Sequence, residues 1–169
     1  MGDIKRKKKK FSRPRKLFDS VRIETENATI NKYGLKNKRE VWKAKSKVST
    51  MRRQAKNLIG KPVAQQKAFF EKLNRIGLNV QAISDVLALN EQNLLDRRLQ
   101  TFLVKKKIVT TSKQARQLIT HKHVLVDGKA VNVPSFIVST DMENKISLKE
   151  GKVKAKKGLN SEGAVEVSA

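Results

Sequence analysis

A change of hydrophobic period near His121 restricts the fold of this chain more than any other feature. Up to residue 120 apolar residues recur at three- and four-residue steps, which predicts helix. From residue 124 the segment VLVDGKAV alternates, which predicts two strands joined by Asp127-Gly128. This dipeptide favours a two-residue type I′ turn, because both central positions need positive φ. We therefore expect a helix followed at once by a tight antiparallel hairpin.

Further elements surround the hairpin. Thr111 and Gln114 have the spacing of a capping box and begin the preceding helix. FIV at 136–138 and KISL at 145–148 predict further short strands, and Pro134 predicts a strand end or an edge. The pattern indicates two helices packed on a small antiparallel sheet.

The N-terminal half of the chain reads as helical. Residues 40–59 place apolar side chains on one stripe and bases on the other face, which is typical of an amphipathic helix. Helices are also expected over about 63–76, around 83–87 and, as one continuous element, over 91–106. Trp42 stands beside the stripe, and we expect it to anchor the core rather than to stack on a base.

The charge of the chain indicates its class of partner. It has 39 Lys and Arg against 15 Asp and Glu, a net charge of +24 on 169 residues. Such a charge favours a polyanion, and nucleic acid is the first candidate because neutralised phosphates release counterions. A membrane partner is not expected, since no stretch approaches the roughly 20 apolar residues of a bilayer span. The absence of cysteine excludes disulfides and suits a reducing cytosol.

Catalytic and metal-binding patterns are missing from the sequence. The only histidines are His121 and His123, with no cysteine or carboxylate cluster beside them to complete a metal site. LIGKP around Lys61 lacks a phosphate loop's pattern, because Ala55 and Pro62 occupy its glycine and Ser/Thr positions. We expect no enzyme activity, no cofactor and no small-molecule substrate.

The segment LLDRRLQTFLVKKKIVTTSKQARQLITHKHVLVDGKAVNVPSFIV, residues 94–138, resembles the S4 RNA-binding module. NKYGLKNKREVWKAKSKVSTMRRQAKNLI, residues 31–59, is similar to the N-terminal helical region of archaeal and eukaryotic members of the uS4 family of ribosomal proteins. The resemblance covers roughly residues 14–150. The chain departs from the family in two places: Lys122 stands where a glycine is usual between the two histidines, and a loop glycine is replaced within KKKIVTT.

The resemblance implies a structural, early-assembling protein of the cytoplasmic small ribosomal subunit. It implies binding to a multi-helix junction in the 5′ domain of small-subunit ribosomal RNA, beside neighbouring small-subunit ribosomal proteins. It also implies a place near the channel through which messenger RNA enters, which makes messenger RNA a further candidate partner. Two alternatives remain: an RNA-modification accessory or enzyme fragment with the same module, and a chaperone acting through charge alone.

The expected architecture is α+β. It consists of a basic flexible N-terminal extension (1–16), a mainly helical RNA-binding domain (17–92), an S4 module (93–150) and a flexible C-terminal tail (151–169).

Candidate RNA-binding residues are basic and polar side chains on helices, helix starts and turns, because folded RNA is contacted largely at phosphates and sugars. They are Lys7, Lys8, Arg13, Arg15, Lys36, Lys38, Arg39, Lys43, Lys45, Lys47, Arg52, Arg53, Lys56, Arg97, Arg98, Lys105, Lys106, Lys107, Lys113, Gln114, Arg116, Gln117, His121, Lys122, His123, Lys129 and Ser135.

Overall fold

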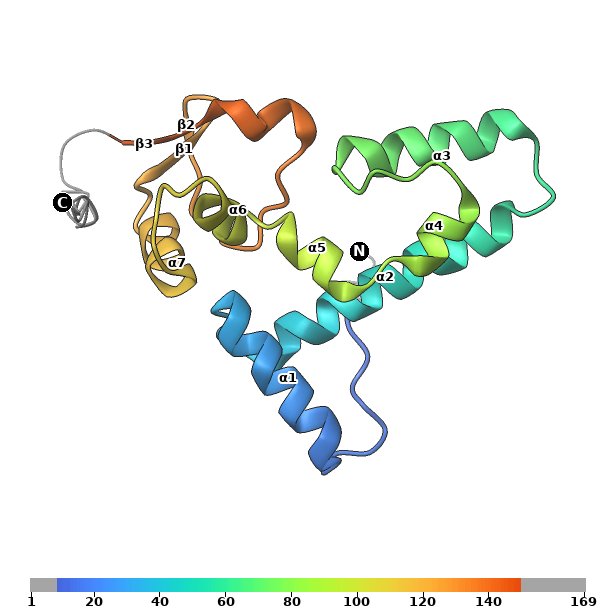
Figure 1. Cartoon of the computed structure of the whole chain (residues 1–169), viewed down its shortest axis with the longest axis horizontal. Coiled ribbons are helices and arrows are strands. Elements are labelled where there is room, and N and C mark those ends of the chain that lie inside the picture. Colours follow the sequence, from blue (N-terminus) through green and yellow to red (C-terminus); the bar gives the residue numbers. More distant parts are fainter. Residues whose placement is uncertain (1–8, 150–169) are drawn as a thin grey trace, which may run out of the picture.

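A computed structural model of the chain describes residues 9–149 and has the expected α+β composition (Figure 1). Within those residues the elements are α1 (Ser20–Tyr33), α2 (Lys38–Leu58), α3 (Val63–Arg75), α4 (Ile83–Ala88), α5 (Glu91–Asp96), α6 (Leu99–Lys105), α7 (Ser112–Thr120), β1 (Val124–Val126), β2 (Lys129–Ala130), the 3-10 helix η1 (Thr140–Lys145) and β3 (Ile146–Leu148). The C-terminal tail and the first half of the N-terminal extension, both expected to be flexible, lie outside the described residues.

Helix α2 is the longest element, and the predicted apolar stripe is its buried face. Val41, Ala44, Val48, Met51 and Ala55 are all buried at helical spacing, against α1, α4 and α5. The opposite face carries the bases. The prediction of an amphipathic helix over residues 40–59 is therefore confirmed.

Helix α1 was not predicted, and its composition explains why. It has no apolar stripe, and its only buried residues are Glu26 and Tyr33. Its ends are nevertheless well defined. The Asp19 side chain accepts a hydrogen bond from the Arg22 N–H, and Gly34 ends the helix in the left-handed region at φ 59°.

The helix expected over residues 91–106 is interrupted, and that prediction is wrong. Arg97 and Arg98 leave the helical path between α5 and α6, because segment 136–138 pairs with them. The Leu99 N–H donates to Phe136 O at 2.7 Å, and the Val138 N–H donates to Arg97 O at 2.9 Å. The prediction that FIV forms a strand of the sheet is therefore also wrong. Its Ile137 instead forms one isolated bridge to Arg98.

The hairpin is confirmed in detail. Asp127 and Gly128 have φ of 52° and 75°, as a type I′ turn requires, and the register pairs Leu125 with Ala130 and Val126 with Lys129. β3 pairs antiparallel with the other edge of β1, giving the order β2-β1-β3. Helices α6 and α7 pack together beside this sheet.

Two hydrophobic cores divide the described chain. One gathers buried residues from Tyr33 to Leu95, and the other gathers those from Leu99 to Ile146. We call residues 9–96 the N-terminal region and residues 99–148 the C-terminal module. The domain limits set at residues 92 and 150 stay a prediction.

Candidate nucleic-acid interface

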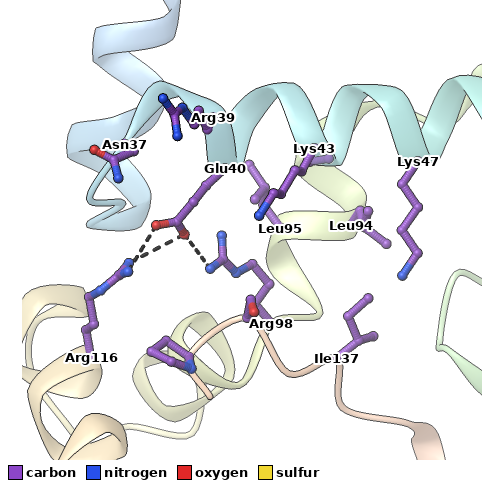
Figure 2. A pocket seen from close by; sticks show the side chains of 13 residues that line it. Asn37, Arg39, Glu40, Lys43, Lys47, Leu94, Leu95, Arg98, Arg116 and Ile137 are labelled. Atoms are coloured by element: carbon purple, nitrogen blue, oxygen red, sulfur yellow. Dashed lines mark hydrogen bonds and ion pairs between the residues drawn. The ribbon is translucent and has the colours of Figure 1, made fainter. Parts of the chain in front are cut away.

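A cleft of about 390 Å³ lies between α2 and the C-terminal module (Figure 2). Helix α2 contributes one wall, α5 the floor, and the Arg97–Arg98 break, α7 and the 134–137 segment the other wall. Its lining is Asn37, Arg39, Glu40, Lys43, Ala44, Lys47, Leu94, Leu95, Arg98, Arg116, Pro134, Ser135 and Ile137. The cleft therefore combines five cationic side chains with one carboxylate.

That carboxylate, Glu40, joins three elements. Its Oε2 accepts a hydrogen bond from Arg98 Nη2 at 2.6 Å, and its Oε1 accepts one from Arg116 Nη2 at 3.0 Å. Figure 2 shows both guanidinium groups reaching the carboxylate from the opposite wall. Burial of the Glu40 carboxyl raises its pKa, but the hydrogen bonds and charges of Arg116 and Arg98 outweigh burial, so the pKa is lowered overall.

Gln100 forms a second contact between the N-terminal region and the C-terminal module. This residue is fully buried, and its Nε2 donates to Tyr33 O and Gly34 O at 3.0 Å and to Ser112 O at 2.9 Å. The approach is close enough that a Cβ on Gly34 would lie 2.9 Å from Ser112 Oγ. The end of α1 is thus fixed to the start of α7.

Arg97 forms a third contact, on the side opposite to that of Arg98. Its Nη2 donates to Val138 O at 2.9 Å and to Glu143 Oε1 at 2.5 Å. Gly77 covers the guanidinium so closely that a Cβ there would overlap it. Arg98 is therefore paired with Glu40 of α2, whereas Arg97 is hydrogen-bonded to the module and packs against Gly77, just after α3.

A second cleft continues along α2 towards α3. It encloses about 690 Å³ and shares Lys43 and Lys47 with the first. Its other cations are Lys9, Lys10 and Lys72, and no carboxylate from the described part of the chain lines it. Partial burial lowers the pKa of Lys47, as expected for an ammonium group removed from water. A polyanion lying along α2 would contact both clefts, because Lys43 and Lys47 belong to each.

Comparison with known proteins identifies the family. The S4 domain matches residues 97–144, which span the Arg97–Arg98 break, the α6–α7 pair and the hairpin. Small ribosomal subunit protein uS4 of Saccharolobus solfataricus is 44% identical over 153 residues, covering 86% of this chain and 84% of the relative. Those of Picrophilus torridus and Methanococcus aeolicus are each 42% identical, over 159 and 154 residues, and each covers 87% of the relative. The chain belongs to the uS4 family.

The structure assembles only part of the residue set predicted from the sequence. The first cleft brings together Arg39, Lys43, Lys47, Arg98, Arg116 and Ser135. Residues that line neither cleft are Arg13, Arg15, Lys36, Lys38, Lys45, Arg52, Arg53, Lys56, Arg97, Lys105, Lys106, Lys107, Lys113, Gln114, Gln117, His121, Lys122, His123 and Lys129. Lys7 and Lys8 lie outside the described residues.

Several of these candidates have partners within the protein. Besides Arg97, Arg98 and Arg116, Arg52 donates to Leu89 O, and Lys106 donates to Glu143 O. Each therefore stabilises the fold, and its RNA contact stays a prediction. The predicted residue set omits three residues of the second cleft, Lys9, Lys10 and Lys72. Lys9 and Lys10 belong to the basic N-terminal extension, whereas Lys72 shows no motif and becomes their neighbour only through packing.

The two departures from the uS4 family pattern share a backbone conformation. Lys107 and Lys122 have φ of 55° and 61°, directly after the ends of α6 and α7. The Ile108 N–H donates to Leu103 O, and the His123 N–H donates to Leu118 O, closing both helices as glycine would. Both lysines are exposed and accept the strain of a left-handed conformation.

Trp42 departs from its expected role. It is half-buried and belongs to neither hydrophobic core, and its Nε1 donates to Glu26 Oε1 at 2.9 Å.

Within residues 9–149, no helix is long and apolar enough to cross a membrane, and no group of three or more acidic or histidine side chains could hold a metal ion.

Proposed function

We propose that the chain is a noncatalytic structural constituent of the small ribosomal subunit in the cytoplasm, and that it binds small-subunit ribosomal RNA through the clefts along α2. One observation carries this proposal. Lys9, Lys10, Lys43, Lys47 and Lys72 line a continuous surface on which the single carboxylate, Glu40, is already paired with two arginines. These five ammonium groups have no ion-pair partner among residues 9–149, and such groups suit phosphates.

The finer role follows from the family resemblance and remains part of this proposal. The RNA site would be a multi-helix junction in the 5′ domain, occupied early in assembly and close to the channel through which messenger RNA enters. Neighbouring small-subunit proteins, and messenger RNA at that channel, would be further partners. The contacts made by Glu40, Gln100 and Arg97 between the N-terminal region and the C-terminal module support binding to a folded RNA junction, because a rigid concave surface can select folded RNA by shape.

Salt titration of a 5′-domain RNA fragment tests the proposal. If about 8 phosphates are contacted, the slope of log affinity against log salt is near −6. Lys43→Ala/Lys47→Ala should weaken binding and reduce the magnitude of this slope by about 1.5, because two phosphate contacts are lost. Lys61→Ala is the matched control, since Lys61 is exposed on the α2–α3 turn and lines neither cleft.

An equal slope for the double variant and wild type would remove the clefts from the binding surface. The alternative function, an RNA-modification accessory, predicts binding to the substrate RNA of a modifying enzyme in preference to the 5′-domain fragment. A competition titration between the two RNAs therefore decides between the functions.

A further inference from the structure

The single tryptophan of the chain lies at the surface in a fixed orientation. The hydrogen bond from Trp42 Nε1 to Glu26 holds one edge of the indole, and Arg22 donates to the same carboxylate oxygen at 2.9 Å. The ring of Phe11 lies 6.1 Å from the indole, centroid to centroid, tilted by 35°. The indole is thus held from α1 and from the N-terminal segment, while part of it remains exposed.

A cleft of about 460 Å³ opens on this indole. It adjoins the first cleft, with which it shares Asn37 and Arg39, and its lining is Arg13, Leu17, Asn37, Lys38, Arg39 and Trp42. The N-terminal segment forms one side and the start of α2 the other. An aromatic ring, an exposed leucine and three cations therefore meet in a space that no carboxylate of residues 9–149 lines.

The polar groups of this cleft are free to bind. Asn37 occupies the N-cap position of α2, yet its side chain makes no capping hydrogen bond, and it is exposed. Arg13, Lys38 and Arg39 have no ion-pair partner within the described part of the chain. In Figure 2, the Arg39 side chain points away from the Glu40 carboxylate, and Arg39 lines both this cleft and the first.

We propose that this cleft receives one unpaired RNA base, stacked on Trp42, with the flanking phosphate held by Arg13, Lys38 and Arg39. The proposal rests on the proposed function, because it concerns the same RNA. Stacking on aromatic rings is the usual way in which proteins hold an unstacked base, and Asn37 offers an amide for its edge. A duplex would not fit this purpose, because its bases are already stacked on one another.

Because Trp42 is the only tryptophan, tryptophan fluorescence reports on the surroundings of this one indole, which also lines a neighbouring cleft of about 300 Å³ beside Arg22 and Glu26. A decameric oligoadenylate titrated into the full-length protein should quench the emission by at least half as the cleft fills. Two polyanions of matched charge, inorganic polyphosphate and a blunt RNA duplex, should bind by fluorescence anisotropy competition but leave the emission within a tenth of its initial value.

Variants separate stacking from charge. Trp42→Leu should weaken oligoadenylate binding roughly 10-fold, since stacking is lost, whereas Trp42→Phe, which keeps an aromatic face, should stay within about threefold. Lys61→Ala, outside the cleft, should match wild type. Circular dichroism verifies that each variant folds. If Trp42→Leu does not fold, the quenching experiment on the wild-type protein still tests the proposal.

The outcomes are distinguishable. Oligoadenylate that binds with salt dependence but leaves Trp42 emission unchanged overturns the base site and keeps the phosphate-binding function. Equal quenching by polyphosphate also overturns it, because charge alone then accounts for the signal. Absence of any RNA binding overturns the proposed function itself.

Discussion

Replacing Glu40 with glutamine tests the contact between the N-terminal region and the C-terminal module. The shape of the side chain is kept, but the charge that faces Arg98 and Arg116 is removed. Hydrogen bonds to charged groups contribute roughly 1.5–3 kcal/mol each. The Arg98 side chain is only 8% exposed, and breaking one partner of a buried ion pair costs about 3–5 kcal/mol. Because the amide oxygen still accepts one hydrogen bond, we expect a loss of about 2–4 kcal/mol in the free energy of unfolding.

Urea unfolding of the full chain measures this loss, and the dependence of the loss on pH tests the direction of the Glu40 pKa shift. The pKa of Glu40 is lower in the folded protein than in the unfolded chain, so its contribution is complete above the ordinary carboxyl pKa. It is lost as the pH falls through the lowered, folded-state pKa. The difference between wild type and Glu40→Gln should therefore be largest at neutral pH and shrink as the solution becomes strongly acidic.

A matched control removes a carboxylate of the same kind elsewhere. Glu71 is exposed on α3 and has no ion-pair partner among residues 9–149, so Glu71→Gln should change the free energy of unfolding by less than about 0.5 kcal/mol. The reasoning is refuted if Glu40→Gln unfolds like this control, or if the loss it causes is the same at acidic and neutral pH.

Two further predictions concern backbone conformation. A Cβ at Gly128 would meet no atom within 4 Å, so the strain in Gly128→Val comes from the positive φ of 75°. We expect this variant to lose about 1–3 kcal/mol in the free energy of unfolding, measured by thermal melting. A variant that melts like wild type would disprove the strained turn. Lys122→Gly should do the reverse and stabilise the chain by up to about 1 kcal/mol, because glycine accepts φ 61° without strain, with Lys122→Ala as the control that keeps the strain. If the same Lys122→Gly variant also binds RNA more weakly in filter titration, the lysine at this position contributes to RNA binding at a cost in stability.

Local chemistry determined which elements could be predicted from the sequence. The Asp127-Gly128 turn and the Thr111 cap depend on residues a few positions apart, and both are present. In the capping box the reciprocal half is absent, because the Gln114 side chain accepts from Thr110 Oγ1 instead. Helix α1 was missed because its burial is slight, and the 91–106 helix was wrongly joined because its interruption depends on a segment 40 residues later.

The candidate site was harder to predict, because its contacts are remote along the chain. Glu40 is 58 residues from Arg98 and 76 from Arg116. In the sequence it is one acid among many bases, and nothing marks it as the residue that joins the two cores. The sequence also does not distinguish Arg97 from Arg98, although Arg97 contacts Glu143 and Arg98 contacts Glu40.

Arginine binds other groups of the protein more often than lysine does, and the chemistry of the two side chains explains why. Five of the ten arginines among residues 9–149 donate side-chain hydrogen bonds to the protein: Arg22, Arg52, Arg97, Arg98 and Arg116. Among the lysines of the same residues only Lys106 donates one, and Lys145 forms an ion pair with Asp127.

A guanidinium offers several donors in a fixed plane, so it can hold carbonyl and carboxylate groups of different elements at once. An ammonium group is a mobile point charge that adapts to a phosphate wherever the backbone passes. The arginines of the junction therefore fix the clefts, and the lysines that line them are left to neutralise RNA. It follows that Arg→Lys substitution should be costly at position 98, where two cores meet, and Lys→Arg substitution tolerated at position 43, where charge alone is needed.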